Sequence, residues 1–265
     1  MKKAILLASF GVFDEEQRRM CLDSVREDVR KEFCDCDVFE AYTSNFIRKK
    51  MEKAGVKMPS LPECLDAVLA EGYEKILVQP LHLTPGEEYG GKIVKPVEDR
   101  QKAHAGIHLG TPLFTLREED SEAFAAAWGA LPPEEGEELV FMGHGSPHLH
   151  NPVYEHLQGL ADAAALPISI GVVEATDTPS FADVLARLRR KGRRRVLLRP
   201  LLLAGGVHAQ EDMAGEGKHS WLSRLRGEGM AVRADTRGLG SYEVFRKCYL
   251  RKIAALIACS YKTDE

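Results

Sequence analysis

Two histidines close to glycines, together with one glutamate, are the residues of this sequence best suited to chemistry. His144 lies between two glycines, His208 follows the glycine pair 205–206 after one residue, and Glu174 directly follows the apolar run 170–173. Two neutral imidazoles and one carboxylate are suitable ligands for zinc, iron(II), cobalt(II) or nickel(II). Because three protein ligands leave coordination positions open, this set predicts a metal site that takes part in catalysis.

Each of these residues also has a simpler interpretation when it is taken alone. His144 fits a turn histidine bonded to a neighbouring carbonyl, and the loop that contains His208 fits a plain connection. Glu174 fits a helix cap or a salt bridge, since a buried carboxylate needs a cation or a hydrogen bond. The functional interpretation therefore depends on whether the fold brings the three residues together.

Short apolar runs alternate along the chain with amphipathic helical patterns, which is typical of an α/β fold with parallel sheets and helices on both faces. Continuously apolar strands fit burial on both sides of such a sheet. Capping residues mark several helix starts, namely Asp14, Ser44, Ser60, Asn151 and Ser180. The predicted strands cover residues 4–10, 37–42, 75–83, 106–110, 138–143, 168–174, 195–203 and 231–235.

The second half of the chain repeats the first. Three matches occur in the same order: residues 5–11 with 140–146, 38–41 with 172–175, and 76–83 with 196–203. We therefore predict two similar halves, each a four-stranded parallel sheet flanked by helices, with a cleft between them. The acidic, proline-containing stretch 131–138 is the natural linker. The predicted domains are residues 1–130 and 131–265, and it is left open whether the final helix packs back on the first half.

Ligands of open parallel sheets bind beyond the carboxyl ends of the strands. His144, Glu174 and His208 all follow strands of the second half, so one rim should hold them. When residues 76–83 are aligned with 196–203, Glu88 falls on His208, which predicts a base or a second carboxylate facing the same cleft. The alternative for Glu88 is an exposed glutamate in the first turn of a helix.

Three further histidines fit simpler roles. His82 falls on an interior strand position, which favours a core histidine, whereas His148 and His150 fit solvated loop residues that could add metal affinity.

Composition, apolar runs and motif content together argue against several classes of function. The chain has 265 residues and a net charge of −4, which does not favour nucleic acid as a partner. No stretch approaches the roughly 18 apolar residues of a membrane span, and the N-terminal apolar run is too short for a signal peptide. The six cysteines, including Cys34 and Cys36, fit a reducing cytoplasm. No phosphate-binding loop or Gly-x-Ser-x-Gly motif occurs, so neither a nucleotide cofactor nor a serine hydrolase is expected.

A basic run between residues 187 and 195 contains six arginines and one lysine. It spans a helix end and the loop into a strand, at the amino end of the sheet. We predict a solvated face there, away from the cleft.

In its order of motifs the chain resembles the class II tetrapyrrole chelatases, and among them the anaerobic-type sirohydrochlorin cobaltochelatases of cobalamin synthesis. The resemblance covers nearly the whole chain, although the segment 175–179 departs from the pattern. The motifs that show it lie at residues 3–7, 9–11, 39–44, 79–82, 86–89, 140–145, 173–174, 204–205, 208–209, 212–213 and 238–240.

The resemblance implies two flavodoxin-like halves around a porphyrin-sized cleft. It places the family's metal-binding residues on His144, Glu174 and His208, and its first-half glutamate on Glu88. It implies ATP-independent insertion of a divalent metal, Co²⁺ or Fe²⁺, into sirohydrochlorin. His144 and His208 would hold the metal, Glu174 would supply charge and accept a proton, and Glu88 would assist.

The substrate is expected to carry carboxylates, so basic groups should line the rim, and Arg48, Lys92 and Lys95 are candidates. Sirohydrochlorin ferrochelation for siroheme synthesis is the close alternative, because the ligand set does not choose between cobalt and iron. A metal-dependent hydrolase and a tetrapyrrole carrier are further alternatives, and homo-oligomer formation is left open.

Overall fold

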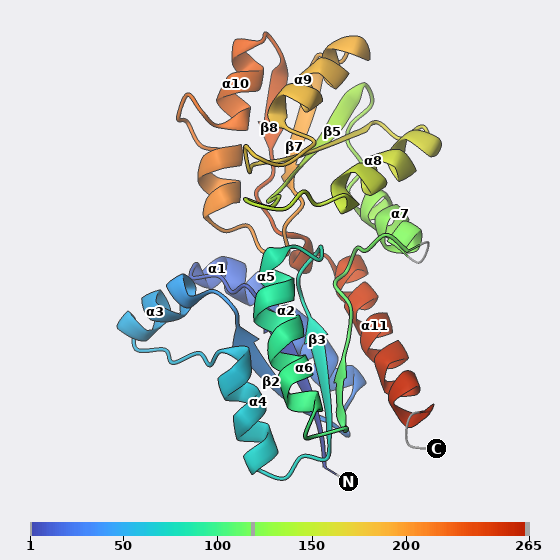
Figure 1. Cartoon of the computed structure of the whole chain (residues 1–265). Coiled ribbons are helices and arrows are strands. Elements are labelled where there is room, and N and C mark those ends of the chain that lie inside the picture. The colour runs from blue at the N-terminus through green and yellow to red at the C-terminus, as the bar shows by residue number, and fades with distance from the viewer. Residues whose placement is uncertain (1, 118–119, 263–265) are drawn as a thin grey trace. The chain divides into compact units, whose positions relative to one another are not determined.

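The computed structural model describes residues 2–117 and 120–262, which form two compact units (Figure 1). The first unit consists of Met1–Thr115 and Glu243–Glu265, and the second is Leu116–Tyr242. The division of the chain therefore lies earlier than residue 131, and the final helix belongs to the first unit.

The first unit is built on a parallel sheet with the strand order β2-β1-β3-β4. Alternate residues of β1 point to opposite faces, and on one face they pack against α4 and α6 in a core cluster. On the other side α11 packs against α2, β3 and β4. The strands are β1 (Lys3–Ser9), β2 (Asp37–Tyr42), β3 (Lys75–Pro80) and β4 (Ile107–Leu109). The helices are α1 (Glu15–Gln17), η1 (Arg18–Asp23), α2 (Ser24–Glu32), α3 (Asn45–Lys53), α4 (Leu61–Ala70), α5 (Glu87–Tyr89), η2 (Gly90–Val94), α6 (Lys95–Gln101) and α11 (Glu243–Lys262).

The second unit repeats this plan with the strand order β6-β5-β7-β8, again all parallel. Its core cluster joins β5 and β7 to α9 and α10, while α8 packs against β6. The strands are β5 (Glu137–Gly143), β6 (Ile168–Val172), β7 (Arg195–Pro200) and β8 (Ala231–Ala234). The helices are α7 (Asp120–Ala130), α8 (Val153–Ala163), α9 (Phe181–Arg190), η3 (His208–Met213), α10 (Trp221–Gly227) and η4 (Leu239–Ser241).

The predicted fold class, two similar α/β halves each with a four-stranded parallel sheet, is confirmed. Most strands lie within a residue or so of their predicted ranges, but β3, β6 and β7 end earlier, so Glu174 lies two residues beyond β6. Ser44, Ser60, Ser180 and Asp14 cap helices as predicted. Asn151 is one residue off, because Pro152 is the N-cap of α8.

The basic run 187–195 is not only a solvated face. Lys191 and Arg193 pair with Glu138, a fully buried carboxylate in β5, at distances of 2.7 and 3.2 Å. Arg195 pairs with Glu134, next to the same strand. The prediction missed this because a glutamate at the start of a strand gives no sign in the sequence that it will be buried. The run therefore neutralises a buried charge at the amino edge of the second sheet.

At the opposite edge of this sheet, Asp235 follows β8 and accepts hydrogen bonds from Arg237 and from Arg199 of β7. Burial of Asp235 favours its neutral form, but the hydrogen bonds from Arg237 and the charge of Arg199 outweigh this effect. The pKa of Asp235 is lowered as a result to about 2.

This shift predicts an acid-dependent contribution to stability. A carboxyl whose pKa is lower in the folded state stabilises the fold above its unfolded pKa and loses that contribution as the pH falls toward its folded pKa. In urea unfolding, wild type should exceed Asp235→Asn in stability at pH 5, and the difference should shrink as the pH approaches 3. If the difference in the free energy of unfolding between wild type and variant stays constant from pH 5 to pH 3, the lowered pKa of Asp235 is contradicted.

Candidate metal-binding site

His144 lies in the loop that follows β5, and the two glycines beside it are required by space. A Cβ atom on Gly143 would lie 2.3 Å from the ring of Tyr154. Gly145 has a φ of +82°, and a Cβ atom there would lie 3.0 Å from the Cβ atom of Glu174. The sequence Gly-His-Gly therefore turns sharply and brings His144 next to the loop that contains Glu174.

His208 is the first residue of η3, a π-helix that follows the glycine pair after β7. The wide turn is visible in the hydrogen bond from the Ala214 N–H to the Ala209 carbonyl, across five residues. Single π-helical turns are rare and often occur at functional sites. His208 is partly exposed, with 42% of its side chain accessible.

The structure brings these two histidines together. The ring centroids of His144 and His208 are 4.7 Å apart, and the ring planes meet at 85°. Strand-end reasoning predicted a common rim for both, and the shared edge of β5 and β7, which are hydrogen-bonded neighbours, provides it.

Hydrogen bonds define which nitrogen of each histidine ring is available to bind a metal ion. His144 Nδ1 lies 3.0 Å from the Gly145 carbonyl oxygen, and His208 Nδ1 lies 2.7 Å from Asp212 Oδ2. A carbonyl or carboxylate oxygen only accepts, so Nδ1 is the donor in both rings. In the neutral imidazoles, Nε2 then has the free lone pair that a metal ion needs.

Glu174 is next to His144 through the backbone, since its N–H donates to the His144 carbonyl at 3.0 Å. Its side chain is half-buried. Among residues 2–117 and 120–262, however, no three His, Cys, Asp or Glu side chains are grouped closely enough to hold a metal ion. The two imidazoles are thus paired in the structure, but they and the Glu174 carboxylate do not form such a group.

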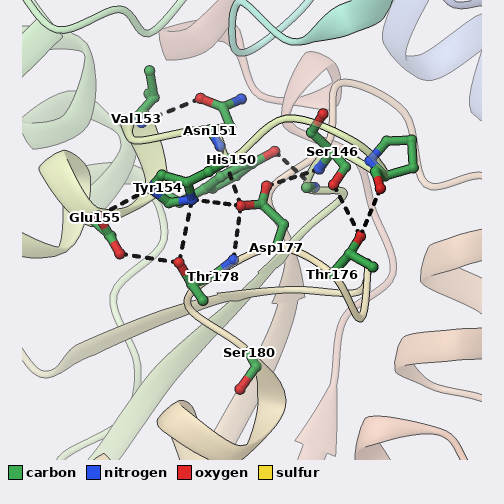
Figure 2. A network of polar contacts seen from close by, with 12 residues as sticks. Ser146, His150, Asn151, Val153, Tyr154, Glu155, Thr176, Asp177, Thr178 and Ser180 are labelled. Atoms are coloured by element: carbon green, nitrogen blue, oxygen red, sulfur yellow. Dashed lines mark hydrogen bonds and ion pairs between the residues drawn. The ribbon is translucent and has the colours of Figure 1, made fainter.

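A network around Asp177 joins the loops of His144 and Glu174 (Figure 2). The Asp177 carboxylate is fully buried and accepts from His150 Nδ1 at 2.8 Å. This hydrogen bond raises the pKa of His150, whose other ring nitrogen lies 3.3 Å from Glu155. His150 is therefore engaged on both sides and is not a free metal ligand. No motif in the sequence marks Asp177, although it lies only three residues after Glu174.

The candidate site residues from the first half of the sequence belong to the first unit. Glu88 is half-buried in α5 of the first unit, while the three other site residues belong to the second. His82 lies two residues beyond the end of β3 and is only half-buried, so the predicted interior strand position is wrong, although burial of its ring lowers its pKa to about 4. Arg48 forms an ion pair with Glu63 and donates a hydrogen bond to the Met58 carbonyl. The remaining rim candidates, Lys92 and Lys95, are exposed in η2 and α6.

Fold and paired imidazoles together define an α/β protein of two repeated units with a candidate site for a transition metal. The chain belongs to the cobalt chelatase family CbiK, whose sequence profile matches residues 3–258. It is 31% identical over 252 residues to sirohydrochlorin cobaltochelatase from Salmonella typhimurium, covering 94% of both chains. It is 34% identical over 261 residues to sirohydrochlorin cobaltochelatase CbiKC from Nitratidesulfovibrio vulgaris, covering 97% of this chain and 91% of that protein.

Solved structures share the fold. SirB from Bacillus subtilis with Fe³⁺ superposes with a TM-score of 0.66 at 17% identity, covering 99% of this chain and 98% of that one. The sirohydrochlorin chelatase SirB from Bacillus subtilis subspecies spizizenii, in complex with cobalt, gives 0.61 at 15% identity and covers 97% and 95%. No described helix has both the length and the apolar character needed to cross a membrane.

Proposed function

We propose that this protein is an enzyme that inserts Co²⁺ into sirohydrochlorin without ATP, in cobalamin synthesis in the cytoplasm. The observation that supports it best is the pairing of His144 and His208, 4.7 Å between ring centroids, with both Nδ1 atoms engaged. The relatives that match over nearly the full chain are named for this reaction.

The proposed reaction exchanges one metal ion for two protons. Sirohydrochlorin loses the protons of two pyrrole nitrogens, which are weak acids, as the metal ion enters the ring. His144 and His208 hold the incoming metal substrate through Nε2, and Glu174 turns toward it as the third ligand. Glu174 accepts one proton and Glu88 assists with the other. Holding metal and ring together lowers the entropic part of the barrier.

Iron is the second candidate metal. A set of two histidines and one carboxylate also suits Fe²⁺, and affinity alone does not select between the two ions in the cell. Ferrochelation of sirohydrochlorin would yield siroheme as the product.

The deciding experiment is anaerobic absorbance spectroscopy of sirohydrochlorin with Co²⁺ or Fe²⁺, with and without the protein. Acceleration over the protein-free rate is expected, and the relative rates rank the two metals. If the protein accelerates metallation by neither ion, the chelatase proposal is wrong.

The carboxylate that orients His208 should tune metal affinity. Partners that accept a hydrogen bond from a metal-binding histidine typically contribute about 10- to 100-fold in affinity. We expect Asp212→Ala to weaken Co²⁺ binding in that range, measured by titration without tetrapyrrole. Asp212→Asn keeps an acceptor and should lose less. Equal Co²⁺ affinities for wild type and Asp212→Ala would show that Asp212 does not contribute to metal binding.

A further inference from the structure

The buried carboxylate of Asp177 is hydrogen-bonded to both loops of the candidate site (Figure 2). Its Oδ2 accepts from the Ser146 N–H at 2.9 Å, two residues after His144. Its Oδ1 accepts from the Thr178 N–H at 2.8 Å and from the Asn151 N–H at 3.2 Å. One side chain thus joins the beginning and the end of the loop 144–151 to the loop that contains Glu174.

Other bonds reinforce the same junction. The Thr176 hydroxyl donates to the Pro147 carbonyl at 3.0 Å, and the Asp177 N–H donates to the Glu174 carbonyl at 3.2 Å. His150 donates to Asp177 and faces Glu155 with its other nitrogen, while the Thr178 hydroxyl donates to Glu155. The two loops therefore form one hydrogen-bonded body, although neither is a helix or a strand.

A carboxylate with none of its side chain exposed is costly unless it is fully hydrogen-bonded. Here three backbone N–H groups and one imidazole satisfy it. A neutral apolar residue would avoid the cost of burial but would leave these donors without an acceptor. The arrangement therefore demands a carboxylate at this position.

We propose that Asp177 is a positioning residue for the metal substrate, which holds the His144 loop against the Glu174 loop so that both ligands can reach one ion. This inference rests on the proposed function. A metal site needs its ligands held to within about 0.5 Å, and loops meet that requirement only when supporting bonds fix them. Asp177 touches neither metal nor ring and acts through the two loops.

Asp177→Asn tests the proposal most directly. Asparagine has the same shape but only one acceptor oxygen, so if that oxygen keeps the three Oδ1 bonds, its amide group faces the Ser146 N–H donor. We expect the dissociation constant for Co²⁺, measured without tetrapyrrole, to rise about 10- to 100-fold. The apparent KM for Co²⁺ should rise in parallel, while the KM for sirohydrochlorin stays within about twofold, which a general loss of stability would not produce.

Two further variants make the result unambiguous. Thr176→Val removes the hydroxyl that donates to the Pro147 and Ser146 carbonyls in the same junction, and should weaken Co²⁺ binding about two- to tenfold in a fully folded protein. Glu138→Gln disturbs a buried carboxylate at the other edge of the same sheet, and its Co²⁺ affinity should match wild type.

Co²⁺ affinity equal to wild type in folded Asp177→Asn would overturn the proposal. If that variant does not fold, unchanged affinity in Thr176→Val overturns it instead. If wild type binds Co²⁺ through His144 but does not metallate sirohydrochlorin, the chelatase function fails, and the effect of Asp177 on Co²⁺ binding still decides the positioning role. If wild type does not bind Co²⁺ at all, both proposals fail.

Discussion

Replacing His144 or His208 with alanine is expected to slow Co²⁺ insertion into sirohydrochlorin by about a hundredfold or more, equivalent to roughly 3 kcal/mol or more. The reason is their pairing: because the ring centroids are only 4.7 Å apart, we propose that the two rings bind one ion as a unit. Removal of either ring should therefore disable the pair, and the double variant should lose little more than each single one. Initial rates of anaerobic metallation for the three variants measure this.

His148 supplies the matched control. It is an exposed histidine of the same loop, four residues after His144, and His148→Ala should retain the wild-type rate. Losses that simply add in the double variant would show that the two histidines act separately, and wild-type rates in both single variants would exclude them from the reaction.

Among the substitutions proposed, Glu138→Gln is expected to lower the free energy of unfolding most, by about 2–3 kcal/mol. Removing one partner of a fully buried ion pair costs roughly 3–5 kcal/mol, because the other charge stays buried without compensation. Glu138 is fully buried, but 28% of Lys191 and 36% of Arg193 remain exposed, so water compensates part of the loss. Glutamine also retains an acceptor for the Ser169 hydroxyl, which is 2.8 Å from Glu138.

Urea unfolding of wild type and variant measures this difference. Glu134→Gln is the control, because Glu134 pairs with Arg195 at the same edge but is 60% exposed. An exposed pair contributes about 0–1 kcal/mol, so this variant should unfold close to wild type. Equal destabilisation by both substitutions would show that burial of Glu138 does not matter.

The sequence was sufficient to predict the strands, their parallel direction and the internal repeat, because buried parallel strands give continuous apolar runs. Strand-end logic also predicted a common rim for His144 and His208, but their pairing depends on the adjacency of β5 and β7, which only the structure shows. The direction of the Glu174 side chain does not follow from it, because a loop residue two positions beyond a strand has no fixed orientation. The role of Asp177 could not be predicted for a related reason. It depends on backbone N–H donors in a loop some thirty residues earlier in the sequence.

The assignment of the final helix illustrates a different limit. Periodicity identifies α11 but not the sheet that it covers. Its place in the first unit is fixed by contacts distant in sequence, such as the hydrogen bond from the Tyr249 hydroxyl to the Leu81 carbonyl at 2.9 Å, and the ion pair of Arg246 with Asp28.

The return of α11 to the first unit means that the polypeptide crosses between the units twice. The second unit, Leu116–Tyr242, is therefore a contiguous insert within a discontinuous host. His144, Glu174 and His208 can in principle be excised or transplanted as one uninterrupted segment. The first unit is built from segments on both sides of this insert, so a truncation before Glu243 would remove α11 from the first unit and leave the segment that carries the histidines uncut.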